Sequence, residues 1–227
     1  MSRDGEPVPE WLRGLADAAS KMEINPQSQP PAHGGRASAV LVLFGAGPSA
    51  GPGTGPAAAE DGASDAPDLL FIQRSADLRL HAGQPAFPGG ATDPGDADQV
   101  ATALREANEE VGLDPASVDV QTTLPRLWIP VSGFVVTPVL AWWRAPHPVA
   151  PVDPREVELV ARVPVAHLAD PANRLRVRHP SGWIGAAFRT ENMLVWGFTA
   201  GVLNTLLEMG GWARPWDQQK PPEALPV

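Results

Sequence analysis

The chain has 227 residues, of which 43% are apolar, a composition and length that suit one well-buried core and are short for two. Its formal net charge of −9 argues against a nucleic-acid-binding protein that acts through a broad basic surface. The absence of cysteine excludes disulfides, thiolate catalysis and cysteine metal sites.

The first part of the chain predicts a short helix, a linker and a strand. Residues 9–19 predict the helix, because Pro9 suits an early helical position and the apolar residues fall on one face. Residues 24–37 are rich in Pro, Gln and Gly and predict the linker. The continuous apolar run at 39–44 predicts a buried strand. Residues 45–67 hold mainly Gly, Pro, Ala, Ser and Asp, which predicts a flexible insert.

Strands and helices continue to alternate in the rest of the chain. The patterns predict further strands at 69–73, 118–124, 134–143 and 157–163, a clear helix at 97–111, and a long apolar helix at 193–209 that Gly210-Gly211 ends. This order predicts an α/β domain at 36–212. An N-terminal extension at 1–35, which carries the short helix, and a C-terminal tail at 213–227 flank the domain.

The expected location is the cytoplasm, without contact to a membrane. No uncharged apolar run approaches the roughly 18 residues that a bilayer-spanning helix needs. The first residues, Met1 to Gly5, are polar and lack the apolar core of a secretory signal. The expected partner is a small molecule, not a nucleic acid. The sequence leaves the oligomeric state open, and a homodimer is compatible with it.

The helix at 97–111 has two different faces. Asp96 is expected to cap it together with Gln99 in a capping box, and Gly112 is expected to end it in a left-handed conformation. One apolar stripe, which predicts the face toward the core, consists of Val100, Ala103, Leu104, Ala107 and Val111.

Three glutamates fall together in a separate sector of the same helix. Glu106, Glu109 and Glu110 lie close to one another at about 100° per residue. Like charges in one sector repel, and a hard divalent cation such as Mg²⁺ or Mn²⁺ would offset that repulsion. A solvated helix surface is the alternative for such a segment. Arg105 lies one turn before Glu109 and is expected to pair with it.

The residues around this helix resemble the Nudix box. That motif reads Gly, five residues, Glu, seven residues, and then Arg-Glu-U-x-Glu-Glu-x-Gly-U, where U is a bulky apolar residue. Here Gly90 fits the first position, and residues 105–113 fit the end. Three departures are present: Asp96 replaces the first Glu, eight residues separate it from Arg105, and Ala107 is small.

The departures are similar to those of the coenzyme A pyrophosphatase branch of the Nudix hydrolases. That branch also carries a segment before the box, which is matched here by Leu69-Leu70, Arg74-Ser75, Arg79, Gly83 and Phe87-Pro88-Gly89-Gly90 at the same spacing. Two further similar stretches lie at 132–138 and 195–201. The resemblance spans roughly residues 38–210, without the insert.

The resemblance implies a fold and a reaction. The implied fold is a Nudix-type α/β/α sandwich with a mixed β-sheet. The implied reaction is metal-dependent hydrolysis of a nucleoside diphosphate-linked compound, and coenzyme A would give adenosine 3′,5′-bisphosphate and 4′-phosphopantetheine. Two alternatives stay open. One is a Nudix hydrolase for ADP-ribose, a dinucleotide or a nucleoside triphosphate, and the other is a non-catalytic domain that senses a nucleotide.

The resemblance also implies roles for the box residues. Glu106, Glu109 and Glu110 would hold Mg²⁺ or Mn²⁺. The general base is a box glutamate in some members of the family and a glutamate on a later loop in others. Glu110 is therefore the first candidate and Glu156 the second, although a solvated strand end would also explain Glu156. Arg105 would orient the box carboxylates.

Four residues before the box are candidate substrate contacts. Arg74 and Arg79 would contact the 3′-phosphate of coenzyme A, because arginine suits the geometry of a phosphate. A surface salt bridge is the alternative for each of them. Gly89 and Gly90 would either form a tight turn or let the backbone approach the phosphates closely.

Overall fold

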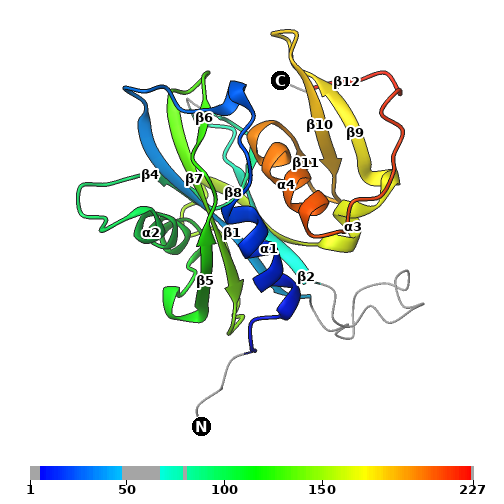
Figure 1. Cartoon of the computed structure of the whole chain (residues 1–227). Helices are drawn as coiled ribbons and strands as arrows, with labels where there is room; N and C mark the ends of the chain where they lie inside the picture. Colours follow the sequence, from blue (N-terminus) through cyan, green and yellow to red (C-terminus); the bar gives the residue numbers. More distant parts are fainter. Residues whose placement is uncertain (1–5, 48–66, 79–80, 226–227) are drawn as a thin grey trace.

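The computed structural model describes residues 6–47, 67–78 and 81–225 (Figure 1). Residues 48–66, which make up most of the predicted insert, and the predicted site residue Arg79 lie outside this part of the chain. Within the described ranges, none of the helices is both long and apolar enough to span a bilayer.

The larger of two sheets is mixed, and its two longest strands run parallel. β1 (Arg36–Ala46) pairs in parallel with β7 (Phe134–Trp143). The other pairs of this sheet are antiparallel: β1 with β2 (Pro67–Arg74) and β4 (Gly89–Ala91), β2 with β3 (Pro85–Ala86) and β8 (Val157–Pro164), and β7 with β5 (Val118–Thr123) and β6 (Leu127–Ile129). The predicted mixed sheet is confirmed.

The central strands are apolar along their length because both of their faces are covered. In β1, Leu41 and Leu43 point to one face and Val42 and Phe44 to the other. All four side chains are at most 1% exposed. The continuous apolar run that predicted this strand therefore reflects two cores, one on each side of the sheet.

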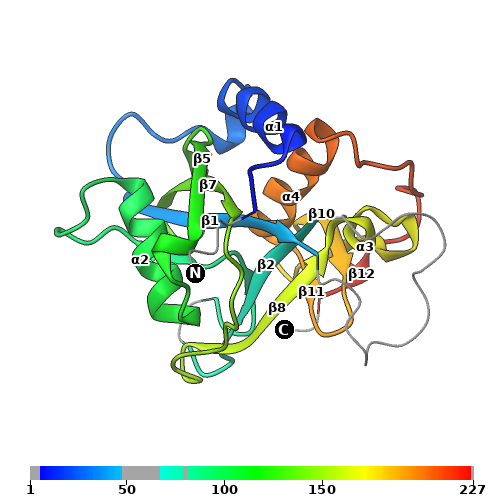
Figure 2. The ribbon, with the colours of Figure 1, turned by 90° about the horizontal axis from the view of Figure 1, so that it is seen from below.

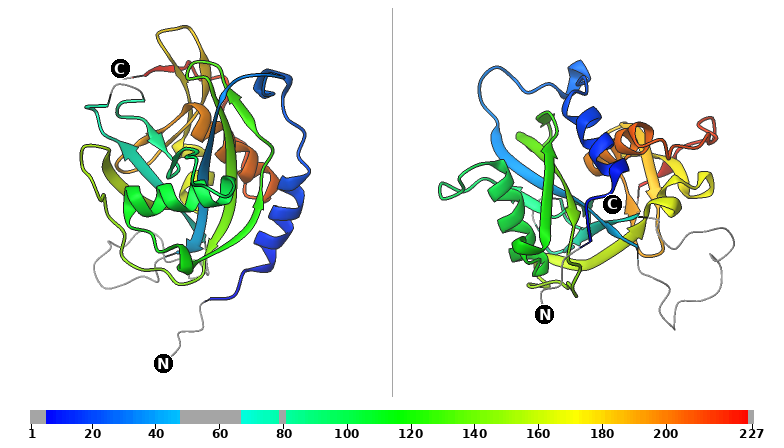
Figure 3. Two further views of the ribbon diagram at one scale, coloured as in Figure 1. Left: turned by 90° about the vertical axis from the view of Figure 1, so that its left-hand side faces the viewer. Right: turned by 60° about the horizontal axis from the view of Figure 1, so that its bottom comes forward.

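Helices form the outer layers on the two faces of the sheet. α2 (Gln99–Val111) covers one face, and α1 (Glu10–Ser20) and α4 (Gly197–Met209) cover the other (Figure 2). Figure 3 shows α2 lying across the sheet on the face away from α1. This arrangement confirms the predicted α/β/α sandwich. The shorter helices are α3 (Val165–Ala169) and the 3₁₀ turns Pro26–Ser28, Pro115–Ser117 and Pro171–Asn173.

α1, in the predicted N-terminal extension, contributes to the core. Leu12 is fully buried and Leu15 is 3% exposed. Trp11 meets the rings of Phe44, Trp142 and Trp212 edge-on, at centroid distances of 5.4, 6.2 and 5.1 Å. The helix is thus held by an aromatic cluster that joins it to the large sheet and to the segment after α4.

A second, smaller sheet has no counterpart in the sequence-based prediction. Its order is β11-β10-β9-β12, formed by Leu194–Val195, Ile184–Arg189, Arg174–Arg178 and Glu223–Ala224. The predicted helix at 193–209 is wrong at its start, because Val195 pairs with Phe188 in β11. Gly197, with φ 65°, then turns the chain into α4.

Much of the predicted C-terminal tail lies against this small sheet. β12 pairs in parallel with β9, and Leu225 beside it is 6% exposed. The guanidinium of Arg174 lies between the rings of Phe188 and Trp216, 5.0 and 4.9 Å from their centroids. Cation–π contacts of this kind favour a fixed position for the segment around Trp216.

Candidate active site

Helix α2 begins after Asp98 and not after Asp96. The carboxylate of Asp98 accepts a hydrogen bond from the backbone N–H of Ala101 (2.8 Å), which makes Asp98 the N-cap. Gln99 is the first helical residue, so the predicted capping box of Asp96 with Gln99 is wrong. The helix ends at Gly112, whose left-handed φ of 70° agrees with the prediction.

The apolar stripe of α2 faces the sheet, as predicted. Ala103, Ala107 and Val111 are at most 1% exposed and share a core cluster with the β1 and β7 side chains on this face. Val100 and Leu104 are partly buried against the same cluster. The small alanines let the helix lie close to the sheet. In the glutamate sector, Glu106 and Glu110 reach Gly90 and Gly89 of β4.

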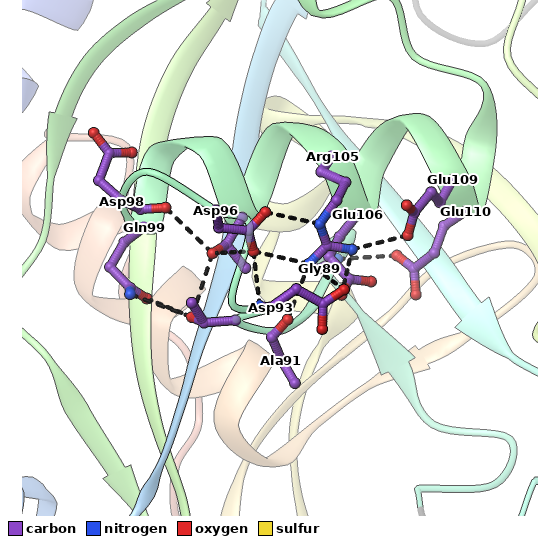
Figure 4. Close-up of polar contacts among 12 residues, drawn as sticks. Gly89, Ala91, Asp93, Asp96, Asp98, Gln99, Arg105, Glu106, Glu109 and Glu110 are labelled. Atoms are coloured by element: carbon purple, nitrogen blue, oxygen red, sulfur yellow. Dashed lines mark hydrogen bonds and ion pairs between the residues drawn. The ribbon is translucent and has the colours of Figure 1, made fainter.

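Arg105 contacts acidic side chains of α2 and of the loop before it (Figure 4). Its Nε and Nη2 donate to the two carboxylate oxygens of Asp96 at 2.9 and 3.0 Å, and Nη2 also donates to the carbonyl of Ala91 at 3.0 Å. Its Nη1 donates to Glu109 at 2.9 Å and lies 3.1 Å from Glu106. The predicted pair with Glu109 is thus confirmed, as one contact of a larger network.

Asp96 is the anchor of this network. Its side chain is 5% exposed and also accepts hydrogen bonds from the hydroxyl of Thr102 and the backbone N–H of Asp93, each at 2.9 Å. The hydrogen bonds from Arg105 hold the pKa of Asp96 well below its usual range, and the same bonds raise the pKa of Arg105. Both groups therefore stay charged, and the pair ties α2 to the loop before it.

Glu106 lies directly over Gly90 of β4. A Cβ atom at position 90 would fall 2.5 Å from the carboxylate atoms of Glu106, so glycine leaves the space that this carboxylate occupies. The Glu106 side chain is 18% exposed. Burial raises its pKa, and the charge of Arg105 opposes that effect.

Glu110 is the most buried of the three glutamates, at 5% exposure. One carboxylate oxygen accepts a hydrogen bond from the backbone N–H of Gly89 (2.9 Å), and the other lies 3.4 Å from Nη1 of Arg74. Burial raises the pKa of Glu110 to about 7, against the opposing effects of Gly89 and Arg74. Glycine is required at position 89, because a Cβ there would lie 2.3 Å from the carbonyl oxygen of Ala39.

Glu156 lies at the rim of this group, just before β8. Its carbonyl accepts a hydrogen bond from the backbone N–H of Ser75 (2.9 Å), which fixes the loop beside the end of β2. Its side chain is exposed, and its charge contributes to the raised pKa of Glu110. The structure therefore brings the two candidate bases, Glu110 and Glu156, into one neighbourhood.

Glu106, Glu109 and Glu110 have the oxygen ligands that a hard divalent cation prefers, but in this structure they are not arranged around a common point. Within the described residues, no three His, Cys, Asp or Glu side chains are gathered around one point. The reason is that Glu106 and the 56%-exposed Glu109 turn to Arg105, while Glu110 turns to Gly89. All three are oxygen donors on one helical sector, and burial disfavours the charge of two of them. A bound cation would offset that cost.

The sequence-based interpretation missed the role of Asp96. It assigned the residue to the helix cap, which Asp98 supplies. The available signal was the second aspartate directly before the helix, which leaves Asp96 free to bind Arg105. Thr102 gave a further signal, because its hydroxyl bonds Asp96 across the first turn of α2.

Comparison with known proteins agrees with this geometry. The sequence matches the NUDIX domain family over residues 58–181, which is more than half of the chain. It is 43% identical over 152 residues to the uncharacterized Nudix hydrolase NudL of Citrobacter koseri, covering 63% of this chain and 76% of that protein. The NudL protein of Escherichia coli is 41% identical over 152 residues, with the same coverage.

The fold is also similar to a solved structure. The Nudix hydrolase RenU from M. smegmatis superimposes with a TM-score of 0.52 and 20% identity, over 82% of this chain and 92% of that one. At this identity the likeness concerns the fold alone. The family match and the two NudL relatives are similar in sequence as well, and they show that this chain belongs to the Nudix hydrolases.

Proposed function

We propose that the chain hydrolyses a nucleoside diphosphate-linked compound with the help of a divalent metal, and that this compound is coenzyme A or one of its derivatives. The products would be adenosine 3′,5′-bisphosphate and 4′-phosphopantetheine. The observation that carries the proposal is the convergence of Glu106 and Glu110 on Gly90 and Gly89, because it joins the box helix to the segment that resembles the coenzyme A pyrophosphatase branch.

The proposal gives each residue of the site a role. Glu106, Glu109 and Glu110 would hold Mg²⁺ or Mn²⁺, which would neutralise the charge of the diphosphate and lower the pKa of a water molecule. Arg105 would position Glu106 and Glu109, since it contacts both. Glu110 is the first candidate for the base that accepts the water proton, and the exposed Glu156 beside it is the second.

The proposal also covers the division of the chain and its setting. Residues 36–212 would form the hydrolase domain, because β1 to β11 and α2 to α4 all lie in this range. Residues 1–35 and 213–227 would flank it and contribute α1 and β12. The expected partner is a small nucleotide-derived substrate, and the expected location is the cytoplasm.

A turnover screen tests the substrate. Purified protein is incubated with Mg²⁺ or Mn²⁺ and coenzyme A, dephospho-coenzyme A, ADP-ribose, a dinucleotide cofactor or a nucleoside triphosphate, and the products are separated. We expect coenzyme A to have the highest kcat/KM. A higher value for ADP-ribose or a dinucleotide would overturn the coenzyme A assignment and keep the hydrolase. Absence of metal-dependent turnover with every compound would contradict the enzymatic proposal as a whole.

A further inference from the structure

Arg74 is placed at the glutamate sector by an irregularity in β2. The register of β2 with β8 shifts between Gln73 and Arg74, at the last residue of the strand. Such bulges re-aim a side chain. The backbone N–H of Arg74 donates to the carbonyl of Gln84 (3.0 Å), and its side chain brings Nη1 to 3.4 Å from Glu110.

Among the described residues, the two arginines beside the glutamates, Arg74 and Arg105, differ in how many of their side-chain donors are already used by the protein. Arg105 lies 2.9 to 3.1 Å from five acceptor atoms, on Asp96, Ala91, Glu109 and Glu106, and a guanidinium has five N–H groups. Arg105 is therefore fully occupied by the protein.

Most side-chain donors of Arg74 make no hydrogen bond within the described part of the chain. Its only side-chain hydrogen bond among the described residues is the contact with Glu110, which at 3.4 Å is longer than a normal hydrogen bond. Its Nε is buried without a partner in the same part of the chain. The side chain is 28% exposed, so a ligand can reach part of it. Of these two described arginines, Arg74 is thus the one that a substrate can engage.

The position of Glu110 indicates which part of a substrate would meet Arg74. A diphosphate that is cleaved at the box carboxylates lies beside Glu110, and its oxygens match the fork of an arginine. The 3′-phosphate of coenzyme A is attached to the ribose, several covalent bonds from that diphosphate. A group within 3.4 Å of Glu110 is therefore better placed for the diphosphate than for the 3′-phosphate.

We propose that Arg74 binds the diphosphate that is cleaved, and that it does not read the 3′-phosphate. This inference rests on the proposed hydrolysis of a diphosphate-linked nucleoside. It replaces the contact with the 3′-phosphate, which the sequence analysis gave as one of two alternatives for this residue. Arg74 then supports every diphosphate-linked substrate equally and does not distinguish coenzyme A from dephospho-coenzyme A.

The test compares Arg74→Gln and Arg74→Lys with the control Arg13→Gln, an exposed arginine of α1 on the opposite face of the sheet. Dissociation constants are measured with Mg²⁺ for α,β-methylene-ADP, whose bridge cannot be hydrolysed, and for adenosine 3′,5′-bisphosphate and AMP, which carry no diphosphate. The values of kcat/KM for coenzyme A and dephospho-coenzyme A are measured alongside.

We expect Arg74→Gln to raise the dissociation constant for α,β-methylene-ADP by about tenfold to a hundredfold, because charge-assisted hydrogen bonds are lost. Arg74→Lys should show a smaller loss, since it keeps the charge without the fork. The affinity ratio of adenosine 3′,5′-bisphosphate to AMP should stay within about twofold in all variants. The kcat/KM values for the two coenzyme A forms should fall in parallel, and Arg13→Gln should change nothing.

Two results would overturn the inference. The first is a collapse of the ratio between adenosine 3′,5′-bisphosphate and AMP in Arg74→Gln, which would assign the residue to the 3′-phosphate. The second is unchanged affinity for α,β-methylene-ADP, which would leave Arg74 a structural partner of Glu110. If Arg74→Gln does not fold, the same binding and kinetic measurements on Arg74→Lys test the inference. Failure of wild-type protein to hydrolyse coenzyme A would contradict the proposed substrate alone, because the binding of α,β-methylene-ADP still tests Arg74.

Discussion

Arg105 and Asp96 form a bidentate ion pair, with Nε–Oδ1 and Nη2–Oδ2 distances of 2.9 and 3.0 Å. The pair joins the second turn of α2 to the loop before the helix. Because Nη1 of Arg105 reaches both Glu106 and Glu109, the position of both glutamates depends on Asp96.

Asp96→Asn should therefore lower activity more than stability. Asparagine keeps the shape but loses one charged acceptor, so Arg105 would be held less firmly, and we expect kcat to fall by about tenfold. The matched control is Asp98→Ala, which removes the N-cap and should cost about 1 kcal/mol of stability with little change in kcat. Kinetics and urea unfolding of both variants check this. A loss of stability in Asp96→Asn with unchanged kcat would contradict the positioning role of Asp96.

Glu110→Gln should keep the fold and lose most of the turnover. The amide retains the size of the side chain and an acceptor for the N–H of Gly89, but it removes the charge that a metal ion needs. We expect kcat to fall by more than about a hundredfold at saturating Mg²⁺, with an unchanged circular dichroism spectrum. Turnover within about tenfold of the wild-type value would contradict a metal-binding or catalytic role.

The sequence-based prediction was most accurate where one periodicity governs a long segment. The strand at 134–143 coincides with β7, and the helix at 97–111 differs from α2 only at its start. Both segments are long and pack against the main core, so their apolar patterns are complete. The small sheet was missed because its strands are short, and because the alternation of Arg174, Arg176 and Arg178 with apolar residues in β9 spans only five residues.

The candidate site was predictable as a set of residue types and not as a set of contacts. Spacing on one helix placed Glu106, Glu109 and Glu110 in a common sector. The partners of these glutamates come from other elements: Gly89 from β4 and Arg74 from the bulged end of β2. Contacts between elements depend on the register of the strands, which a single sequence does not display.

α1 should be necessary for full stability. Leu12 is completely buried between the large sheet and α4, so Leu12→Ala should cost about 2–5 kcal/mol through lost burial and the cavity that remains. Asp17→Ala on the exposed side of the same helix removes only a solvent-exposed pair with Lys21 and should cost less than about 1 kcal/mol. Denaturant unfolding measures both. Equal, small costs would show that α1 is not part of the cooperative unit.

Asp68 should make stability depend on pH in a defined direction. It is 1% exposed beside Arg162 (2.8 Å), and burial raises its pKa to about 6 against the opposing charge of Arg162. The folded state therefore holds a proton between about pH 4 and 6 that the unfolded state has released, so stability falls as pH rises through this window. A pKa difference of about two units corresponds to about 3 kcal/mol.

The comparison with Asp68→Asn isolates this effect. Unfolding free energies of wild type and variant are measured from about pH 4 to about pH 8.5, across the window set by the two pKa values, and other titrating groups cancel in the difference. We expect the wild type to lose stability relative to the variant as pH rises to about 6, and the difference to level off above about pH 7. A difference that is flat, or that grows in favour of the wild type with rising pH, would show that Arg162 keeps Asp68 ionised throughout.

Gly90→Ala should separate the position of Glu106 from the stability of the fold. The added methyl would lie 2.5 Å from the Glu106 carboxylate, which sits at the flexible end of its side chain. The carboxylate can therefore swing away at little cost in stability, but it then leaves the position shared with Arg105. We expect kcat to fall by about tenfold or more, with a melting temperature within a few degrees of wild type. Gly95→Ala in the loop after β4 is the matched control, because a methyl there meets no atom within 4 Å. If both variants keep full activity, the site tolerates displacement of Glu106, and its assignment as a metal ligand loses its support. If both lose activity together, the whole segment from β4 to α2, and not the space at position 90, controls the reaction.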